Sequence, residues 1–232
     1  MLAVSAVVVS AGEPEPIVSV ADLHFVAPGL ELLPAGSPVE GDAVRIVGHI
    51  QASGSQAWTK AGVVLDRGLP GEPDSHELNA PSVIYDGGEY KMWYAGTTGS
   101  MTGSILYATS PDGVSWTKHG TVLAPGSPPE NVNVHYPCVM KDGVMYKMWY
   151  SGYDGSHYRI FYATSADGLT WNRQRLVLDI GPNGSYDDNF AVSPFVLKEG
   201  SAYRMWYSGN DGAHVRLLYA TSRWTWLDEA GR

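Results

Sequence analysis

The chain has 232 residues, a formal net charge of −9 at neutral pH and a hydrophobic share of 44%. Lysine and arginine are not clustered, so we predict no nucleic-acid partner and no membrane partner. The single cysteine, Cys138, excludes an internal disulfide and a cysteine-based zinc cluster. The histidines lack paired ligand spacing, and we therefore predict no metal and no cofactor.

The chain begins with a valine-rich run at residues 4–10. This run is too short to span a bilayer and lacks the basic region of a secretory signal. Its β-branched residues predict a strand. A trimmed remnant of a signal is the alternative.

A repeated segment dominates the rest of the sequence. Residues 81–96, 137–152 and 194–209 align without a gap, and each contains Met-Trp-Tyr-x-Gly. Their tryptophans Trp93, Trp149 and Trp206 are 56 and 57 residues apart. Such a period predicts a repeat architecture in which each unit is one supersecondary element.

A second motif follows each copy. Tyr-Ala-Thr-Ser begins at Tyr107, Tyr162 and Tyr219, and the first two copies continue into Ser-x-Asp-Gly-x-x-Trp. A degenerate copy of that element ends at Trp58. We therefore predict one domain over residues 1–232 with four repeats, approximately 17–68 (degenerate), 69–127, 128–183 and 184–232 (truncated).

Each repeat reads as four strands, which in the second repeat are residues 82–85, 89–95, 104–110 and 116–123. Alternation at period two with Asp-Gly turns is typical of antiparallel hairpins. Four strands per repeat predict an all-β fold, a β-propeller of four-stranded antiparallel blades, with four repeats counted. The run at residues 4–10 would supply the strand that the truncated repeat lacks and so close the ring.

The repeat resembles that of the β-propeller glycoside hydrolases, the arabinanase, levansucrase and invertase superfamily with families 32, 43, 68 and 130. The resemblance rests on Pro-x-Val-x-x-Asp-Gly-x-x-Tyr-x-Met-Trp-Tyr-x-Gly followed by Tyr-Ala-Thr-Ser, over about residues 70–222. It implies five blades, a carbohydrate ligand, a secreted or periplasmic location, and an axial pocket with three acidic residues. In families 32 and 43 these acids precede the proline by one or two positions, where this chain has Asn79-Ala80, His135-Tyr136 and Val192-Ser193.

Three other acids hold equivalent places in the repeats. Asp74, Glu130 and Asp187 each lie seven residues before the repeat proline. Cleavage of a glycosidic bond needs two carboxyl groups of different pKa. We predict these three as catalytic candidates, with capping of a repeated loop as the alternative.

Residues that differ between repeats, or that place polar and aromatic groups in the neighbouring loops, are the predicted substrate-binding set. In the loops before the first strands this set is His76, Asn79, His135, Tyr136, Asp188 and Asn189. In the loops between second and third strands it is Tyr153, Asp154, His157, Arg159, His214 and Arg216.

The sequence thus predicts a glycoside hydrolase-like protein that acts on a glycan or oligosaccharide with acidic residues in an axial pocket. Two alternatives remain at this point: a non-catalytic propeller that binds a carbohydrate or another partner, and a minimal repeat scaffold without ligand. The chain is predicted to be a monomer or a homo-oligomer that completes the ring, because a broken propeller leaves open strand edges.

Overall fold

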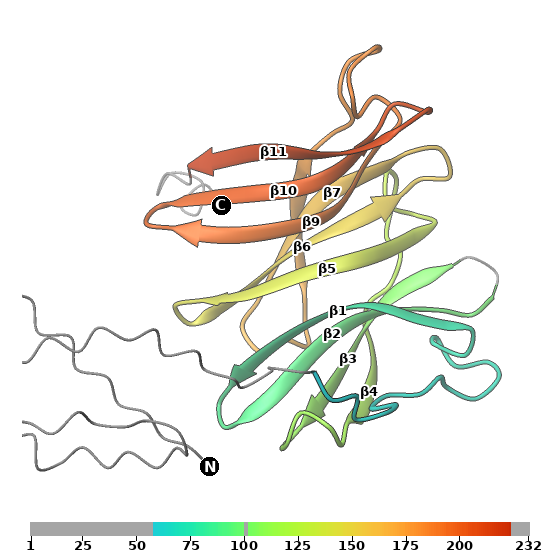
Figure 1. The fold of residues 1–232 in the computed structure, drawn as a ribbon, viewed down its shortest axis with the longest axis vertical. Coiled ribbons are helices and arrows are strands. Elements are labelled where there is room, and N and C mark those ends of the chain that lie inside the picture. The colour runs from blue at the N-terminus through green and yellow to red at the C-terminus, as the bar shows by residue number, and fades with distance from the viewer. Residues whose placement is uncertain (1–57, 100–101, 224–232) are drawn as a thin grey trace, which may run out of the picture. The chain divides into compact units, whose positions relative to one another are not determined.

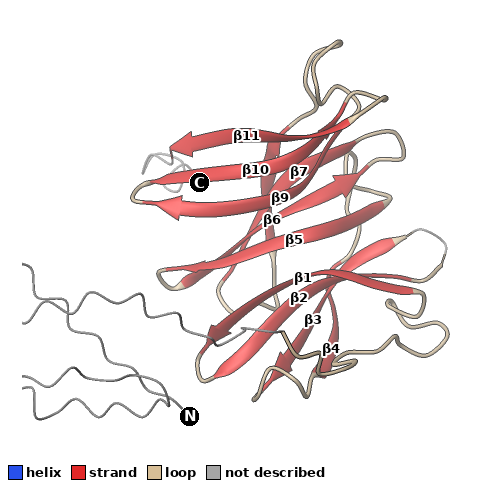
Figure 2. Ribbon diagram, viewed as in Figure 1, coloured by secondary structure: helices blue, strands red, loops and turns tan. Residues whose placement is uncertain are grey.

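The computed structural model describes residues 58–99 and 102–223, and in this part of the chain every regular element is a β-strand (Figures 1 and 2). The predicted strand at residues 4–10 and most of the degenerate repeat lie outside the described residues. Among the residues described, no helix is long and apolar enough to cross a membrane.

The strands form three antiparallel sheets, each in sequence order. Blade 1 contains β1 (Glu77–Asp86), β2 (Glu89–Thr97), β3 (Gly103–Ser110) and β4 (Thr117–Leu123). Blade 2 contains β5 (Asn133–Asp142), β6 (Met145–Tyr153), β7 (Tyr158–Ser165) and β8 (Asn172–Leu178). Blade 3 contains β9 (Phe190–Glu199), β10 (Ala202–Asn210) and β11 (Val215–Arg223). The predicted all-β fold of four-stranded antiparallel sheets is confirmed, while the number of blades and the closure of the ring stay predictions.

The first hairpin of blade 1 follows from its turn residues. Asp86 pairs with Glu89, which leaves Gly87 and Gly88 as a two-residue connection. Their φ angles of 67° and 89° lie in the left-handed region that glycine adopts at little cost. A turn with both central residues there matches the twist of the flanking strands.

The first strands begin earlier than the sequence predicts. β1 starts at Glu77 and crosses Pro81, where the prediction began at residue 82. Its register shifts between Asn79 and Ser82, so a bulge carries the strand past the proline, which has no N–H to donate to the ladder. β5 has the same shift between His135 and Cys138.

The tryptophans of the second strands lie between blades. Trp93 and Trp149 are 0% and 3% exposed and belong to the hydrophobic core. Trp93 packs with residues of blade 2, and its indole N–H donates to the carbonyl oxygen of Gly168 over 2.8 Å. Trp206 of blade 3 is 38% exposed.

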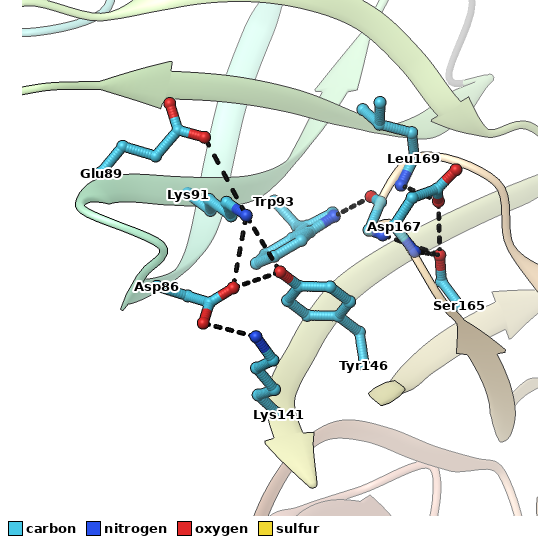
Figure 3. A network of polar contacts seen from close by, with 10 residues as sticks. Asp86, Glu89, Lys91, Trp93, Lys141, Tyr146, Ser165, Asp167 and Leu169 are labelled. Carbon is cyan, nitrogen blue, oxygen red and sulfur yellow. Dashed lines mark hydrogen bonds and ion pairs between the residues drawn. The ribbon is translucent and has the colours of Figure 1, made fainter. Parts of the chain in front are cut away.

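A polar cluster joins blade 1 to blade 2 at the turn end of the strands, and we call it the inter-blade clasp (Figure 3). The hydroxyl of Tyr146 and the ammonium of Lys141, both from blade 2, each lie 2.5 Å from a carboxylate oxygen of Asp86. Lys91 of blade 1 donates to the Tyr146 hydroxyl over 3.0 Å. Lys141 and then Tyr146 hold the pKa of Asp86 well below its usual range.

The clasp recurs between blade 2 and blade 3. Asp142 accepts hydrogen bonds from Lys198 and from the hydroxyl of Tyr203, both over 2.5 Å. Lys147 donates to the same hydroxyl over 2.9 Å. Each junction therefore takes a carboxylate and a cation from one blade, and a lysine and a tyrosine from the next.

The Ser-x-Asp-Gly-x-x-Trp segments form compact turns between third and fourth strands. In the second of these, Asp167 accepts the N–H groups of Leu169 and Thr170 over 2.8 Å, and the Trp171 indole donates to the carbonyl of Gly168. These backbone hydrogen bonds lower the pKa of Asp167 to about 2.

Candidate functional site

The acidic residue Asp74 is buried within blade 1. Its side chain is 2% exposed. The Tyr94 hydroxyl donates to its carboxylate over 3.0 Å, and the Lys118 ammonium lies 2.6 Å away. Both partners belong to strands of the same blade, so the loop that carries Asp74 is tied to its own sheet.

Glu130 has the same surroundings in blade 2. It accepts a hydrogen bond from the Tyr150 hydroxyl over 2.8 Å and pairs with Arg173 over 2.9 Å. Burial raises the pKa of Glu130, against the lowering effects of Tyr150 and Arg173. In blade 3, Asp187 accepts from the hydroxyls of Tyr207 and Ser185 over 2.8 and 2.9 Å.

A glycine lies directly beneath each of these acids. A Cβ atom at Gly96 would lie 2.7 Å from the Cβ of Asp74. At Gly152 it would lie 2.6 Å from the Cβ of Glu130, so only glycine leaves room for the acid. The tyrosine and the glycine are both part of the repeated Met-Trp-Tyr-x-Gly, which explains why acid, tyrosine and glycine recur together.

The described contacts of the three acids favour the structural alternative, in which each acid anchors a repeated loop to its own blade. Asp74 and Glu130 are 2% and 6% exposed, so their partners within the blade leave little of either carboxylate for a substrate. Each is held by a tyrosine, which serves to position a loop. A catalytic role for them stays a prediction.

The starts of the first strands differ from these anchored loops. Ala80, Tyr136 and Ser193, the residues before the repeat prolines, have φ angles of 50°, 54° and 57°. Residues other than glycine reach this left-handed region at a cost of about 1–3 kcal/mol, and such strain collects at functional sites. The strain recurs at the positions where the resemblance places catalytic acids.

Two polar atoms beside these strained residues are buried without a hydrogen-bond partner. They are Oδ1 of Asn79 and Nε2 of His135. His135 is 8% exposed and packs against Gly103 of blade 1, and burial lowers the pKa of its imidazole, which favours the neutral ring. A buried polar group without a partner costs about 1–3 kcal/mol, so its presence calls for a reason.

Aromatic rings surround this position from blades 2 and 3. The Tyr136 ring lies 5.7 Å from that of His135. Tyr158 stacks on Tyr153 at 4.5 Å and meets Phe190, the first residue of β9, edge-on at 5.4 Å. Flat aromatic faces next to polar groups suit a sugar, which presents both apolar C–H faces and hydroxyls.

Glu77 lies in the same neighbourhood and was not predicted from the sequence. Its charge acts on His135 and favours the protonated imidazole. The available signal was a difference between repeats, because the equivalent positions hold Asn133 and Phe190.

Glu77 and Asn79 also line an open groove of about 510 Å³, together with Asp66, Arg67 and His76. We call Glu77, Asn79, His135, Tyr136 and Tyr158 the first-strand site.

The remaining predicted binding residues have local partners. Asp154 accepts the N–H groups of Ser156 and His157 over 2.8 Å and pairs with Arg159 over 2.5 Å. In blade 3, Arg216 pairs over 2.5 Å with Asp211, which also accepts the N–H of His214. These pairs close the hairpins β6–β7 and β10–β11.

Three further predicted residues are also held locally. Tyr153 donates to the carbonyl of Gly155 over 2.8 Å. Asp188 accepts the N–H of Gly184 over 2.7 Å, and the Asn189 amide donates to Asn210 over 3.0 Å. The structure thus brings His135 and Tyr136 near Tyr158 and Tyr153, the last residue of β6, and places Asn79 in the groove beside Glu77, while Asp188 and Asn189 belong to the loop before β9. Within the described part of the chain, no group of three or more histidine, cysteine, aspartate or glutamate side chains is arranged to hold a metal ion.

Comparison with solved structures shows the architecture. The chain superposes on a family 117 glycoside hydrolase of the marine bacterium Zobellia galactanivorans with a TM-score of 0.56 and 18% identity, over 62% of this chain and 52% of that one. It superposes on the β-1,2-mannobiose phosphorylase of Listeria innocua with a TM-score of 0.53 and 16% identity, over 66% of this chain and 42% of that one. The blades have the fold of the β-propeller glycoside hydrolases. The resemblance carried by the repeats is therefore confirmed for the fold.

Two relatives are similar to this chain in sequence. An uncharacterized protein of Mycobacterium tuberculosis is 38% identical over 147 residues, which are 60% of this chain and 48% of that protein. A probable arabinan endo-1,5-alpha-L-arabinosidase A of Aspergillus fumigatus is 30% identical over 173 residues, 72% of this chain and 50% of that protein. The chain spans about half the length of these relatives. No model of a protein family matches it.

Proposed function

We propose that the chain is a carbohydrate-binding propeller of the glycoside-hydrolase type, which holds a glycan at the first-strand site. The observation that carries this proposal is the pair of buried polar atoms without partners, Oδ1 of Asn79 and Nε2 of His135, beside strained backbone. Sugar hydroxyls both donate and accept, so a glycan that displaces the cover over these atoms, which for His135 is Gly103, would supply the missing hydrogen bonds. The rings of Tyr136 and Tyr158 would cover its apolar face.

Hydrolysis of that glycan is the second candidate, with Asp74, Glu130 and Asp187 as its carboxyl groups. The raised pKa of Glu130 favours it, because a general acid must keep its proton near the working pH. Glu77 is the acidic residue of the first-strand site, where one carboxylate alone does not complete a glycosidase pair. The relatives suggest which glycans to try: arabinan from the Aspergillus protein and β-1,2-mannosides from the Listeria enzyme.

The test is calorimetric binding of arabinan and manno-oligosaccharides to the wild type and to His135→Leu. We expect the variant to bind at least about tenfold more weakly, a loss of about 1.4 kcal/mol. It should unfold at the same temperature or higher, because an apolar side chain of similar size replaces a buried group without a partner.

His119→Leu is the matched control, since His119 lies on the outer strand β4 in contact with Thr109 and away from the first strands. Should His135→Leu fold poorly, Asn79→Ala tests the same site. Equal affinity of the wild type and both site variants would contradict the proposal. Release of shorter sugars from the glycan by the wild type would support the hydrolytic function as well.

A further inference from the structure

Blade 3 presents an apolar face whose counterparts in blades 1 and 2 are buried. Trp206 is 38% exposed where Trp93 is fully buried, and Tyr219 is 49% exposed where Tyr107 is 4% exposed. Phe195 and Leu197 of β9 extend the same face and are 58% and 48% exposed. In blades 1 and 2 the next blade covers these positions.

The same face carries one half of an inter-blade clasp. Glu199 and Arg204 form an ion pair at the positions of Asp86 and Lys91. Arg204 also donates to the Tyr219 hydroxyl over 2.9 Å. Among the residues described, no lysine and tyrosine reach Glu199 as Lys141 and Tyr146 reach Asp86.

Blade 1 carries the tyrosine of the complementary half on its opposite face, and Tyr85 stands at the position of Lys141 and Lys198. Tyr90 occupies the repeat position of Tyr146 and Tyr203, and in the described part of the chain its hydroxyl has no hydrogen-bond partner. Val83 is 45% exposed where its counterpart Val139 is 6% exposed. Tyr85, beside Tyr90, is 63% exposed.

A carbonyl oxygen on blade 1 is also available for a tryptophan. The carbonyl of Gly168 in blade 2 accepts two indole N–H groups, from Trp93 of the preceding blade and from Trp171 of its own turn. Its counterpart Gly113 accepts only that of Trp116 within the described residues. Trp206 holds the repeat position of Trp93 and could therefore provide the second indole N–H to Gly113.

We propose that blade 3 of one copy packs on blade 1 of a second copy of this chain, head to tail, in the manner of the two junctions within the chain. Glu199 would accept the hydroxyl of Tyr90, and Trp206 would donate to the Gly113 carbonyl. Leu65 already packs against the cluster that contains Met92 and Ala108 farther along the blade 1 face, so the contact centres on the turn end near Tyr85. Such a heterologous contact closes into a ring if the rotation permits.

Sedimentation velocity over a concentration series tests this contact. We expect the wild type to associate and Leu197→Asp to raise the dissociation constant at least tenfold. Leu169→Asp is the matched control, because Leu169 is 45% exposed and lies in the β7–β8 turn, outside both surfaces. Tyr85→Asp should weaken association as strongly as Leu197→Asp.

Mixing the two weakened variants tests whether the contact is head to tail. Each keeps one intact surface, blade 3 in Tyr85→Asp and blade 1 in Leu197→Asp, so the mixture should form a dimer that neither forms alone. A wild type that stays monomeric at its highest soluble concentration would overturn the proposal. So would association that survives Tyr85→Asp, because a face-to-face contact of two blades 3 would not use Tyr85.

Discussion

The anchored acids and the first-strand site lie at the same end of the blades, yet their side chains are satisfied to different degrees. Glu130 has a tyrosine and an arginine within its own blade, and Asp74 has a tyrosine and a lysine. Asn79 and His135, a few residues farther along the chain, keep buried polar atoms without partners. Recurrence in the repeats therefore accounts for the anchored acids as structural residues, whereas the proposed site rests on unsatisfied polar atoms at positions that vary between repeats.

The largest effect on stability is expected when one of the anchored acids is removed. Glu130→Ala removes the partner of Tyr150 and Arg173 and leaves a buried hydroxyl unsatisfied, so we expect the free energy of unfolding to fall by about 2–3 kcal/mol. Urea titration measures the change. Glu89→Gln, at a side chain that is 46% exposed, is the control and should change little. An unchanged stability of Glu130→Ala would remove the anchoring role.

A smaller effect is expected at the inter-blade clasp. Tyr146→Phe removes the hydroxyl that donates to Asp86 and accepts from Lys91, at a cost of about 1–2 kcal/mol. Tyr186→Phe, at a ring that is 59% exposed, should be neutral within error. The same urea titration compares the two, and equal stabilities would show that the clasp does not hold the blades together.

The smallest effect on stability is expected when the pH is lowered. The pKa of Asp154 and of Asp167 is about 2, below the usual 3.8. A lowered carboxyl pKa stabilises the fold above the unfolded value, and that stability is lost as pH falls from about 4 toward 2. We expect a melting temperature that is level from pH 7 to 5 and then falls.

Asp167→Asn should make this acid limb shallower by its own share, because Asp86 and Asp154 contribute as well. Asp66→Asn, at an exposed carboxylate outside the turns, should leave the limb unchanged. Thermal melts of both variants across the pH series measure the difference. A limb equally steep in Asp167→Asn would contradict the assignment of the effect to that turn.

Local sequence patterns predict the fold, but they predict the candidate site only in part. Alternation and Asp-Gly turns are local signals, and they placed the second strand of blade 1, predicted at residues 89–95 and observed as β2 (Glu89–Thr97). Tyr136 was predicted as a binding residue, but its left-handed backbone was not, because the residue before a proline ordinarily avoids that region. The bulge imposes it, and a bulge depends on the pairing of two strands.

The roles of the acids were harder to predict. Glu130 and Tyr150 are 20 residues apart, and only folding shows that one holds the other. Their joint recurrence in every repeat was the available signal for anchoring. Recurrence among the acids does not indicate Glu77, because the equivalent positions in the other repeats are not acidic.

The most direct test of the central claim measures glycan binding and stability side by side for Glu130→Gln and His135→Leu. The account predicts that Glu130→Gln unfolds more easily and binds glycan within about threefold of the wild type, while His135→Leu keeps its stability and binds at least about tenfold more weakly. The opposite pattern, an intact fold with lost binding or turnover in Glu130→Gln and full binding in His135→Leu, would make the anchored acids the functional set.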